Sequence, residues 1–127
     1  MKTFQRSNMK DLKEFIYSSC IHDAQIESVR HNLKNNTLVI ETFHPFFQVK
    51  MLFTFNDVSL VFAIKGNEDG NRDTIASLTV EDDFSYLHQY LTKGQAIRED
   101  DLYLLFQMFS LDELHVVFHS VKIKTEA

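Results

Sequence analysis

Hydrophobic and polar residues near the start of the chain follow a helical period. From position 7, apolar residues recur three and four positions apart, with charged residues on the opposite side. The apolar positions are Met9, Leu12, Phe15 and Ile16. Ser7 or Asn8 is suited to accept the free amide hydrogens at the helix start, and residues 18–20 (Ser-Ser-Cys) have weak helix propensity where the helix should end. The pattern predicts an amphipathic helix that packs on a sheet.

A period of two replaces the helical period further along the chain and predicts β-strands. Residues 24–31 and 37–43 are rich in Ile, Val and Leu and flank an Asn-rich turn, which predicts a hairpin. After an interruption at His44-Pro45, residues 48–55 alternate most regularly and predict a third strand.

Two further alternating segments predict a second hairpin. The first alternating set, which is predicted to share one face, is Val58, Leu60, Phe62 and Ile64. The second segment covers residues 75–80. The polar stretch at residues 65–73 contains two glycines and would form the connecting turn.

The end of the chain predicts a third hairpin. Two apolar, β-favouring segments, residues 102–109 and 114–123, flank the short stretch Ser-Leu-Asp-Glu. A helix over residues 102–111 is the alternative for the first of these segments.

A short second helix is predicted between the second and third hairpins. Asp82 or Asp83 is placed to cap its start, and Gly94 is placed to stop it. Its apolar face would consist of Phe84, Leu87 and Leu91. These patterns together predict an α+β fold, an antiparallel sheet of about six strands in three hairpins, with the N-terminal helix and, as an option, the second helix packed on one face.

Length and composition fit one domain that spans residues 1–127. The chain has 12 Phe and 4 Tyr, and a chain of 127 residues can bury a core without metals or disulfides. Cys20 is the sole cysteine, and the first residues lack the apolar segment of a secretory signal, so we expect a cytoplasmic protein. No apolar run is long enough to span a bilayer, so we expect no membrane insertion.

The charge distribution bears on the class of partner. The formal net charge is −5, and no basic stripe is present that would neutralise phosphates, so nucleic acid is not expected as a partner. A mildly acidic surface favours approach of a basic protein, and it equally serves solubility. A homodimer through an exposed sheet edge stays open.

Two pairs of residues have the chemistry of catalytic or metal sites. His22 and Asp23 are types found in acid–base catalysis, but neighbours on a strand point to opposite faces, so a structural Asp that accepts backbone hydrogen bonds is favoured. His115 and His119 have the four-residue spacing that binds zinc on a helix, whereas on a strand that spacing separates the side chains by about 13 Å. Cys20 lacks a local activating motif. We expect no enzymatic activity, no metal and no cofactor.

Two charged stretches are predicted to be solvated connections. Residues 67–73 offer oxygens of the kind that bind calcium, but a helix-flanked calcium loop counted from Asp69 requires Gly and Glu where the chain has Thr74 and Val80. Residues 98–101 (Arg-Glu-Asp-Asp) are likewise predicted to be a solvated connection.

The segment 42–47 (Thr-Phe-His-Pro-Phe-Phe) is the most unusual part of the sequence. A proline-containing turn is expected at the surface, yet three of its residues are phenylalanines. Burial of these rings against the first helix is favoured over display. If they are displayed, Phe43, Phe46 and Phe47 form the candidate partner-binding site.

Several short motifs resemble those of a group of small uncharacterised bacterial proteins. They are residues 21–29 (IHDAQIESV), 37–40 (TLVI), 55–58 (FNDV) and 114–123. Some proteins with this His-Asp-Ala hairpin opening are assigned as immunity proteins, which bind and block toxins from competing bacteria. The resemblance covers about half the chain and implies a sheet-based fold and an immunity-type role. Protein binding is therefore the expected function, and the alternative is a small-molecule binder with a Phe-lined pocket on a curved sheet.

Overall fold

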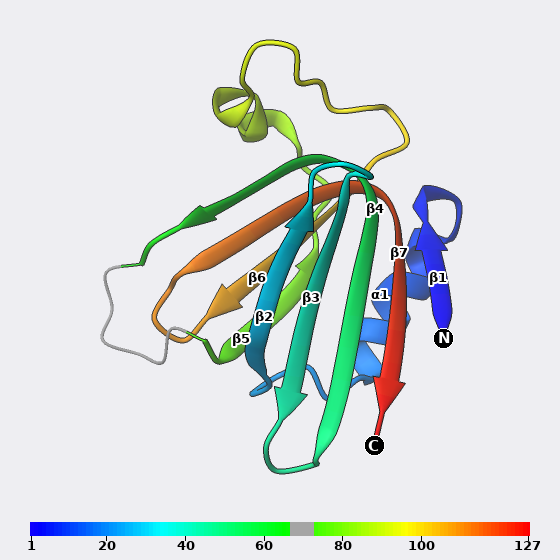
Figure 1. The fold of residues 1–127 in the computed structure, drawn as a ribbon, viewed down its shortest axis with the longest axis vertical. Coiled ribbons are helices and arrows are strands. Elements are labelled where there is room, and N and C mark those ends of the chain that lie inside the picture. The colour runs from blue at the N-terminus through cyan, green and yellow to red at the C-terminus, as the bar shows by residue number, and fades with distance from the viewer. Residues whose placement is uncertain (67–72) are drawn as a thin grey trace.

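The computed structural model describes residues 1–66 and 73–127 and shows one seven-stranded antiparallel sheet with helices packed on it (Figure 1). The elements are, in chain order, β1 (Lys2–Gln5), the 3-10 helix η1 (Arg6–Asn8), α1 (Met9–Ser18), β2 (Gln25–Asn32), β3 (Thr37–His44), β4 (Val49–Ile64), β5 (Ile75–Val80), the 3-10 helix η2 (Ser85–Tyr90), β6 (Leu102–Met108) and β7 (Glu113–Glu126). The strand order is β2-β3-β4-β7-β6-β5, and β1 also pairs with β7. The predicted α+β class is confirmed, with one strand more than expected. None of the described helices is long and apolar enough to cross a membrane.

The strand β4 joins two segments that the sequence presents as separate strands. Asp57 has a positive φ of 51°, and the pairing with β7 shifts register between Val58 and Leu60. This bulge changes which positions face the core, because an extra residue reverses the alternation. Val58 packs in the main core and Leu60 in a second cluster on the opposite face, so the prediction that they share one face is wrong.

Two of the three predicted hairpins are confirmed and one is wrong. β2 pairs with β3, and β6 pairs with β7, so the helix alternative for residues 102–111 is excluded. In the described part of the chain, however, the second half of β4 pairs with β7, and β5 pairs with β6. Residues 58–64 and 75–80 each alternate as a hairpin strand does, but alternation does not specify which strand is the partner. Their partners, β7 and β6, are more distant in the sequence.

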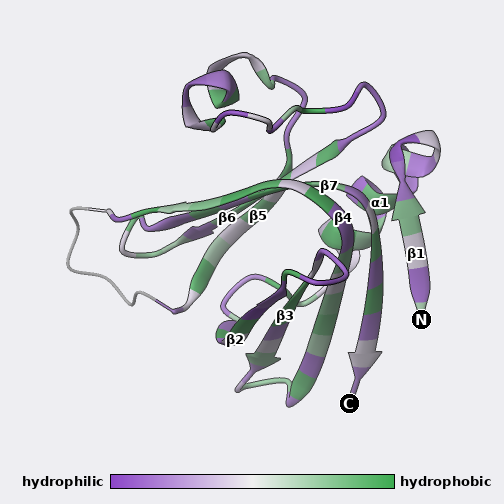
Figure 2. Ribbon diagram, turned by 45° about the horizontal axis from the view of Figure 1, so that its top comes forward, coloured by the Kyte–Doolittle hydropathy of each residue, from purple (hydrophilic) through white to green (hydrophobic). Residues whose placement is uncertain are grey.

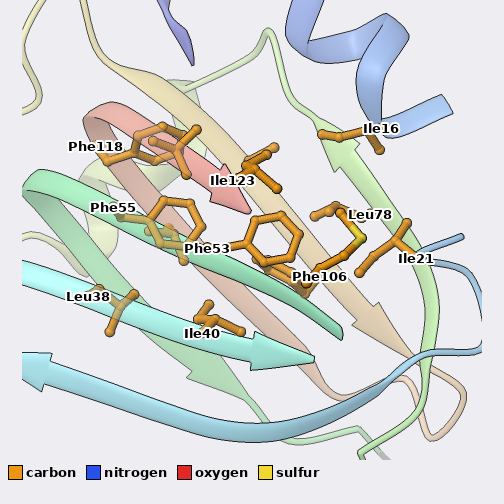
Figure 3. Close-up of a cluster of buried hydrophobic side chains, with 14 of the residues drawn as sticks. Ile16, Ile21, Leu38, Ile40, Phe53, Phe55, Leu78, Phe106, Phe118 and Ile123 are labelled. Carbon is orange, nitrogen blue, oxygen red and sulfur yellow. The ribbon is translucent and has the colours of Figure 1, made fainter. Parts of the chain in front are cut away.

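The bulge bends the sheet so that its two halves face one another, and the main core lies between them (Figures 2 and 3). The rings of Phe53 and Phe106, from the two halves, meet edge to face with centroids 5.6 Å apart. Phe55 meets Phe118 in the same way at 4.7 Å. These four rings are fully buried against each other and against aliphatic side chains. These rings fill the space between the two halves of the sheet, where a small-molecule binder would need an open pocket.

The helix α1 and the 3-10 helix η2 lie on opposite faces of the sheet. Leu12 and Ile16 of α1 belong to the main core, as the helical period predicts. Leu87 of η2 instead packs with Leu60 and Tyr103 on the other face. The optional placement of both helices on one face is therefore wrong, because the bulge in β4 gives the second half of the sheet an apolar outer side that η2 covers.

Candidate functional site

The turn between β3 and β4 displays two of the three phenylalanines that the sequence indicates. Phe43 is in the last part of β3, and Phe46 and Phe47 lie in the turn 45–48. The Phe46 side chain is 81% exposed and Phe47 is 58% exposed, whereas Phe43 is half-buried. The favoured burial of these rings against α1 is wrong for Phe46 and Phe47. Figure 2 shows this hydrophobic turn at the end of the hairpin, away from the core.

Hydrogen bonds within the turn hold its backbone in one shape. The Gln48 main-chain N–H donates to the His44 carbonyl oxygen at 2.8 Å, and the Gln48 side-chain amide donates to the Pro45 carbonyl oxygen at 2.7 Å. The Phe47 N–H donates to Nδ1 of His44 at 3.2 Å. Gln48 has a positive φ of 57°, a conformation that costs a residue with a side chain about 1 kcal/mol and that these contacts stabilise.

The position of His44 explains why the Phe47 ring is anchored and the Phe46 ring projects. His44 faces inward and is 6% exposed. The Phe47 ring lies against its imidazole, with centroids 4.7 Å apart. Phe46 meets Phe47 edge to face at 5.0 Å and has the larger exposed fraction. The pair therefore forms a small, ordered apolar knob on the surface.

Phe43 lies on the outer face of β3, beside a shallow surface hollow of about 330 Å³ that Gln48, Lys50 and Glu126 also line. The Lys50 ammonium contacts the Glu41 carboxylate at 2.9 Å. The hydrogen bond and charge of Lys50 hold the pKa of Glu41 below its usual range, and Glu41 in turn raises the pKa of Lys50. The exposed Phe46–Phe47 pair thus lies near the Phe43 ring, the surface hollow and the Lys50–Glu41 ion pair.

His22 and Asp23, for which a structural role was favoured over catalysis, lie at the surface. Nδ1 of His22 contacts the Asp23 carboxylate at 3.2 Å, and both side chains are more than half exposed. Asp23 has a φ of 70°, and its main-chain N–H donates to the Ile75 carbonyl oxygen. Asp23 therefore has a structural role through its turn conformation, with the imidazole as the partner of its carboxylate. Cys20 is a free, partly buried thiol.

The two histidines of β7 have different partners. His115 is buried on the outer side of the second half-sheet, and His119 contacts the Asp100 carboxylate at 3.1 Å. Among the described residues, no three His, Cys, Asp or Glu side chains are grouped as metal ligands would be. The calcium-loop candidate falls mostly in residues 67–72, outside the described residues.

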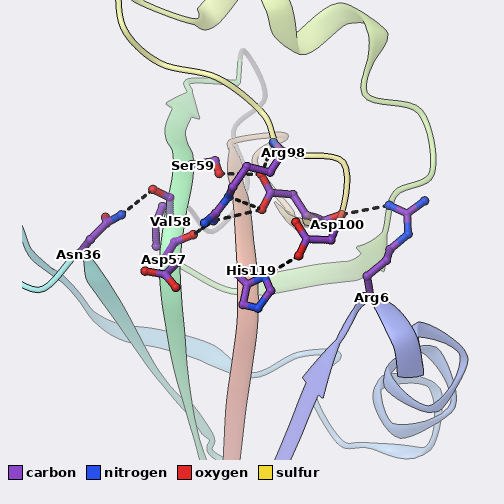
Figure 4. Close-up of polar contacts among 9 residues, drawn as sticks. Arg6, Asn36, Asp57, Val58, Ser59, Arg98, Asp100 and His119 are labelled. Atoms are coloured by element: carbon purple, nitrogen blue, oxygen red, sulfur yellow. Dashed lines mark hydrogen bonds and ion pairs between the residues drawn. The ribbon is translucent and has the colours of Figure 1, made fainter.

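Residues 98–100 are exposed, as predicted for a solvated connection, but the prediction is wrong for Asp101, which is fully buried. Figure 4 shows the Ser59 and Arg98 side chains that contact it. Its carboxylate accepts hydrogen bonds from the Ser59 hydroxyl at 2.6 Å and from the Arg98 main-chain N–H at 2.8 Å. The Arg98 guanidinium contacts the same carboxylate at 3.1 Å and also donates to the Asp57 carbonyl oxygen. The cluster fastens the segment that follows η2 to the bulge of β4.

A buried polar cluster under η2 was missed by the sequence analysis. Nε2 of His115 contacts the Glu113 carboxylate at 2.8 Å, and Nδ1 contacts the Tyr103 hydroxyl at 2.5 Å. The Tyr86 hydroxyl of η2 bonds to the Tyr103 hydroxyl. Burial raises the pKa values of both tyrosines above their ordinary range. The pattern Glu113-x-His115 on one face of a strand is the sequence signal that indicates such a pair.

Comparison with protein-family models, with curated proteins and with solved structures finds no match for this chain.

Proposed function

We propose that this protein binds a partner protein through Phe43, Phe46 and Phe47 and occludes the surface that it covers. The observation that carries the proposal is the exposure of Phe46 and Phe47 on a turn that hydrogen bonds hold in place. The resemblance to immunity-type proteins supports the same role, in which binding alone blocks the partner. A cytoplasmic location and the absence of catalysis belong to this proposal.

The energetics of an ordered aromatic knob support binding. A few side chains near the centre of an interface, often aromatic, dominate the binding energy and contribute about 2 kcal/mol or more each. The Phe47 ring already lies against His44 and Phe46, so its rotation is restricted before binding. Less conformational entropy is then lost when a partner covers the rings.

The proposed partner offers an apolar pocket that accepts the rings of Phe46 and Phe47. Around that pocket it carries polar groups that meet Lys50 and Glu41, because a charged pair at an interface rim must keep its hydrogen bonds. Phe43 and the adjoining hollow would form the border of the contact.

The experiment compares the double substitution Phe46→Ser and Phe47→Ser with a matched control at two other exposed apolar residues. The control is Tyr17→Ser with Leu33→Ser, whose side chains are 92% and 82% exposed. Tagged proteins are incubated with lysate of the native host, and a protein retained by the unchanged chain is identified, purified and titrated. We expect its affinity to fall by more than about 2 kcal/mol for the double substitution and to stay unchanged for the control.

Thermal unfolding of the same proteins separates lost binding from lost folding. Exposed side chains outside a core contribute little, so both variants should unfold within about 1 kcal/mol of the unchanged protein. Equal loss of affinity in the control, or full affinity in the Phe46/Phe47 variant, would refute the proposed site.

A further inference from the structure

A groove of about 520 Å³ lies between β1 and α1 and shares no lining residue with the aromatic turn. Its floor is formed by the rings of Phe4 and Phe15, whose centroids are 5.4 Å apart. Lys2 and Thr3 line it from β1. The acidic side chains that line it from α1 are Asp11 and Glu14. Figure 1 shows β1 and α1 next to one another at the edge of the sheet.

The Asn8 side chain bonds to the main chain of β1 inside this groove. Its Oδ1 accepts a hydrogen bond from the Gln5 N–H at 2.7 Å, and its Nδ2 donates to the Thr3 carbonyl oxygen at 3.3 Å. A residue of a neighbouring parallel strand makes the same two contacts, because its N–H and C=O reach residues two apart on the strand beside it. The Asn8 carboxamide thus takes the place of the N–H and C=O of one strand residue on the β1 edge.

This arrangement also corrects the predicted helix cap. Asn8 stands at the N-cap position of α1, yet its side chain makes no hydrogen bond to the first amides of the helix. The side chain is directed to β1 instead, where its contact with the Gln5 N–H is also part of a capping box at the start of η1. Its loss would therefore expose the strand edge and remove a cap contact from η1, but it would remove none from α1.

The charge of the groove favours a basic occupant. Two carboxylates, Asp11 and Glu14, line it against one ammonium, Lys2. Both carboxylates are exposed, and among the described residues neither has an ion-pair partner within 4 Å; the nearby Lys13 pairs with Asp82. A cation above the apolar floor would contact these carboxylates and the Phe15 ring together.

We propose that the groove binds an extended, basic peptide segment of a partner protein, which adds to β1 as a strand and displaces the Asn8 side chain. Main-chain hydrogen bonds to Thr3 and Gln5 supply the alignment, as in other cases of strand addition. Alternate side chains of the segment rest on Phe15, and its Lys or Arg residues meet Asp11 and Glu14. This site is independent of the aromatic turn.

The probe is a fluorescein-labelled Lys-Val-Lys-Val-Lys peptide, compared with the Glu-Val-Glu-Val-Glu peptide and with a version of the Lys peptide that carries N-methylated amides. Fluorescence anisotropy gives affinity, and two-dimensional NMR of the labelled protein reports the Thr3 and Gln5 amides and the Asn8 side-chain amide. We expect the Lys peptide to bind at least about tenfold more tightly than either comparison peptide, and these three NMR signals to shift.

Variants of the protein test the two parts of the proposal. Asp11→Lys and Glu14→Lys should each lower the affinity for the Lys peptide by about fivefold. Glu27→Lys, an equal charge change on β2, should change that affinity by less than about twofold. Asn8→Ala should strengthen binding, because no side chain then competes for the strand edge. The Phe46→Ser/Phe47→Ser protein should bind the peptide unchanged, which separates this site from the proposed function.

Specific results would overturn the site. Equal binding of the Glu peptide or of the N-methylated peptide would do so, as would unshifted Thr3 and Gln5 amides. Weaker binding by an Asn8→Ala protein that melts at the unchanged temperature would also contradict strand addition. If Asn8→Ala prevents folding, the two charge reversals and the N-methylated peptide still decide the question, because they leave the β1 contacts of Asn8 in place.

Discussion

The imidazole of His44 accepts a hydrogen bond from the main-chain N–H of Phe47 and lies against the ring of the same residue. One buried side chain therefore fixes both the backbone and the ring of the aromatic turn. Because Nδ1 is the acceptor, the hydrogen of the neutral imidazole is on Nε2.

Replacing this acceptor should loosen the turn. His44→Phe keeps a planar ring but leaves the Phe47 N–H without its partner, so we expect a loss of about 1 kcal/mol in the free energy of unfolding and a weaker partner complex. His44→Asn places an oxygen near the former Nδ1. It should restore part of the lost stability and part of the lost affinity for the partner. Denaturant unfolding and partner titration measure these effects, and an unchanged complex with His44→Phe would mean that the turn is ordered by its other contacts.

We expect most of the stability that α1 provides to come from the side chains that it buries in the core. Leu12 is fully buried and Phe15 is half-buried. Leu12→Ala should therefore cost about 2 to 5 kcal/mol in the free energy of unfolding, and Phe15→Ala should cost less than the full burial value of about 3 to 5 kcal/mol. Urea unfolding of both variants checks the order, with the exposed Tyr17→Ala as control. A cost below about 1 kcal/mol for Leu12→Ala would show that the helix is peripheral.

The tyrosine cluster under η2 should make the protein sensitive to alkali. Burial raises the pKa of Tyr103 above the ordinary tyrosine value of about 10, so above that pH the unfolded chain releases a proton that the folded chain retains. The stability contributed by the protonated hydroxyl is complete below about pH 10 and falls as the pH rises further. Unfolding measured from pH 8 to pH 11 should show this fall.

The variant Tyr103→Phe identifies the group responsible. It should be less stable at neutral pH, because His115 and Tyr86 lose a partner, but its stability should decline less steeply above about pH 10. A slope equal to that of the unchanged protein would assign the alkaline effect to other tyrosines.

The Asp101 carboxylate should be one of the most costly polar groups to remove. Asp101→Ala leaves the Ser59 hydroxyl and the Arg98 main-chain N–H without their acceptor, and the loss of the acceptor costs about 1 to 3 kcal/mol for each such group. The Arg98 guanidinium is 44% exposed, so water replaces part of its lost contact and it adds less to the cost. Ser59→Ala should cost about 1 kcal/mol, since the carboxylate keeps its contacts to Arg98. Thermal unfolding of the two variants measures the difference, and equal losses would contradict the central position of Asp101.

Elements with a clear period were predictable from the sequence, and contacts between distant elements were not. The period of α1 and the alternation of β2 and β3 follow from residues next to each other in the chain. The pairing of β4 with β7 depends on residues 49 to 76 positions apart, such as Phe62 and His115. The four residues of β1, with Phe4 as the single buried position, are too few to show alternation.

The residues of the candidate site were predictable from the sequence, but the environment that the sequence favoured for them, burial, was wrong for Phe46 and Phe47. The sequence indicates that Phe43, Phe46 and Phe47 are unusual beside Pro45, but composition favours burial of three phenylalanines. Display follows from the inward orientation of His44, which occupies the core position at the end of β3 and leaves Phe46 and Phe47 outside it.

The length of β4 and β7 has a consequence for how the molecule opens. Both strands pass through the two halves of the sheet, and they pair from Lys50 with Glu126 to Ile64 with Glu113. Neither half can lose its strands without breaking the ladder of the other, so amide hydrogens in the two halves should exchange with solvent water through one common opening reaction. The bulge at Asp57 therefore bends the sheet without dividing the protein into separately unfolding parts.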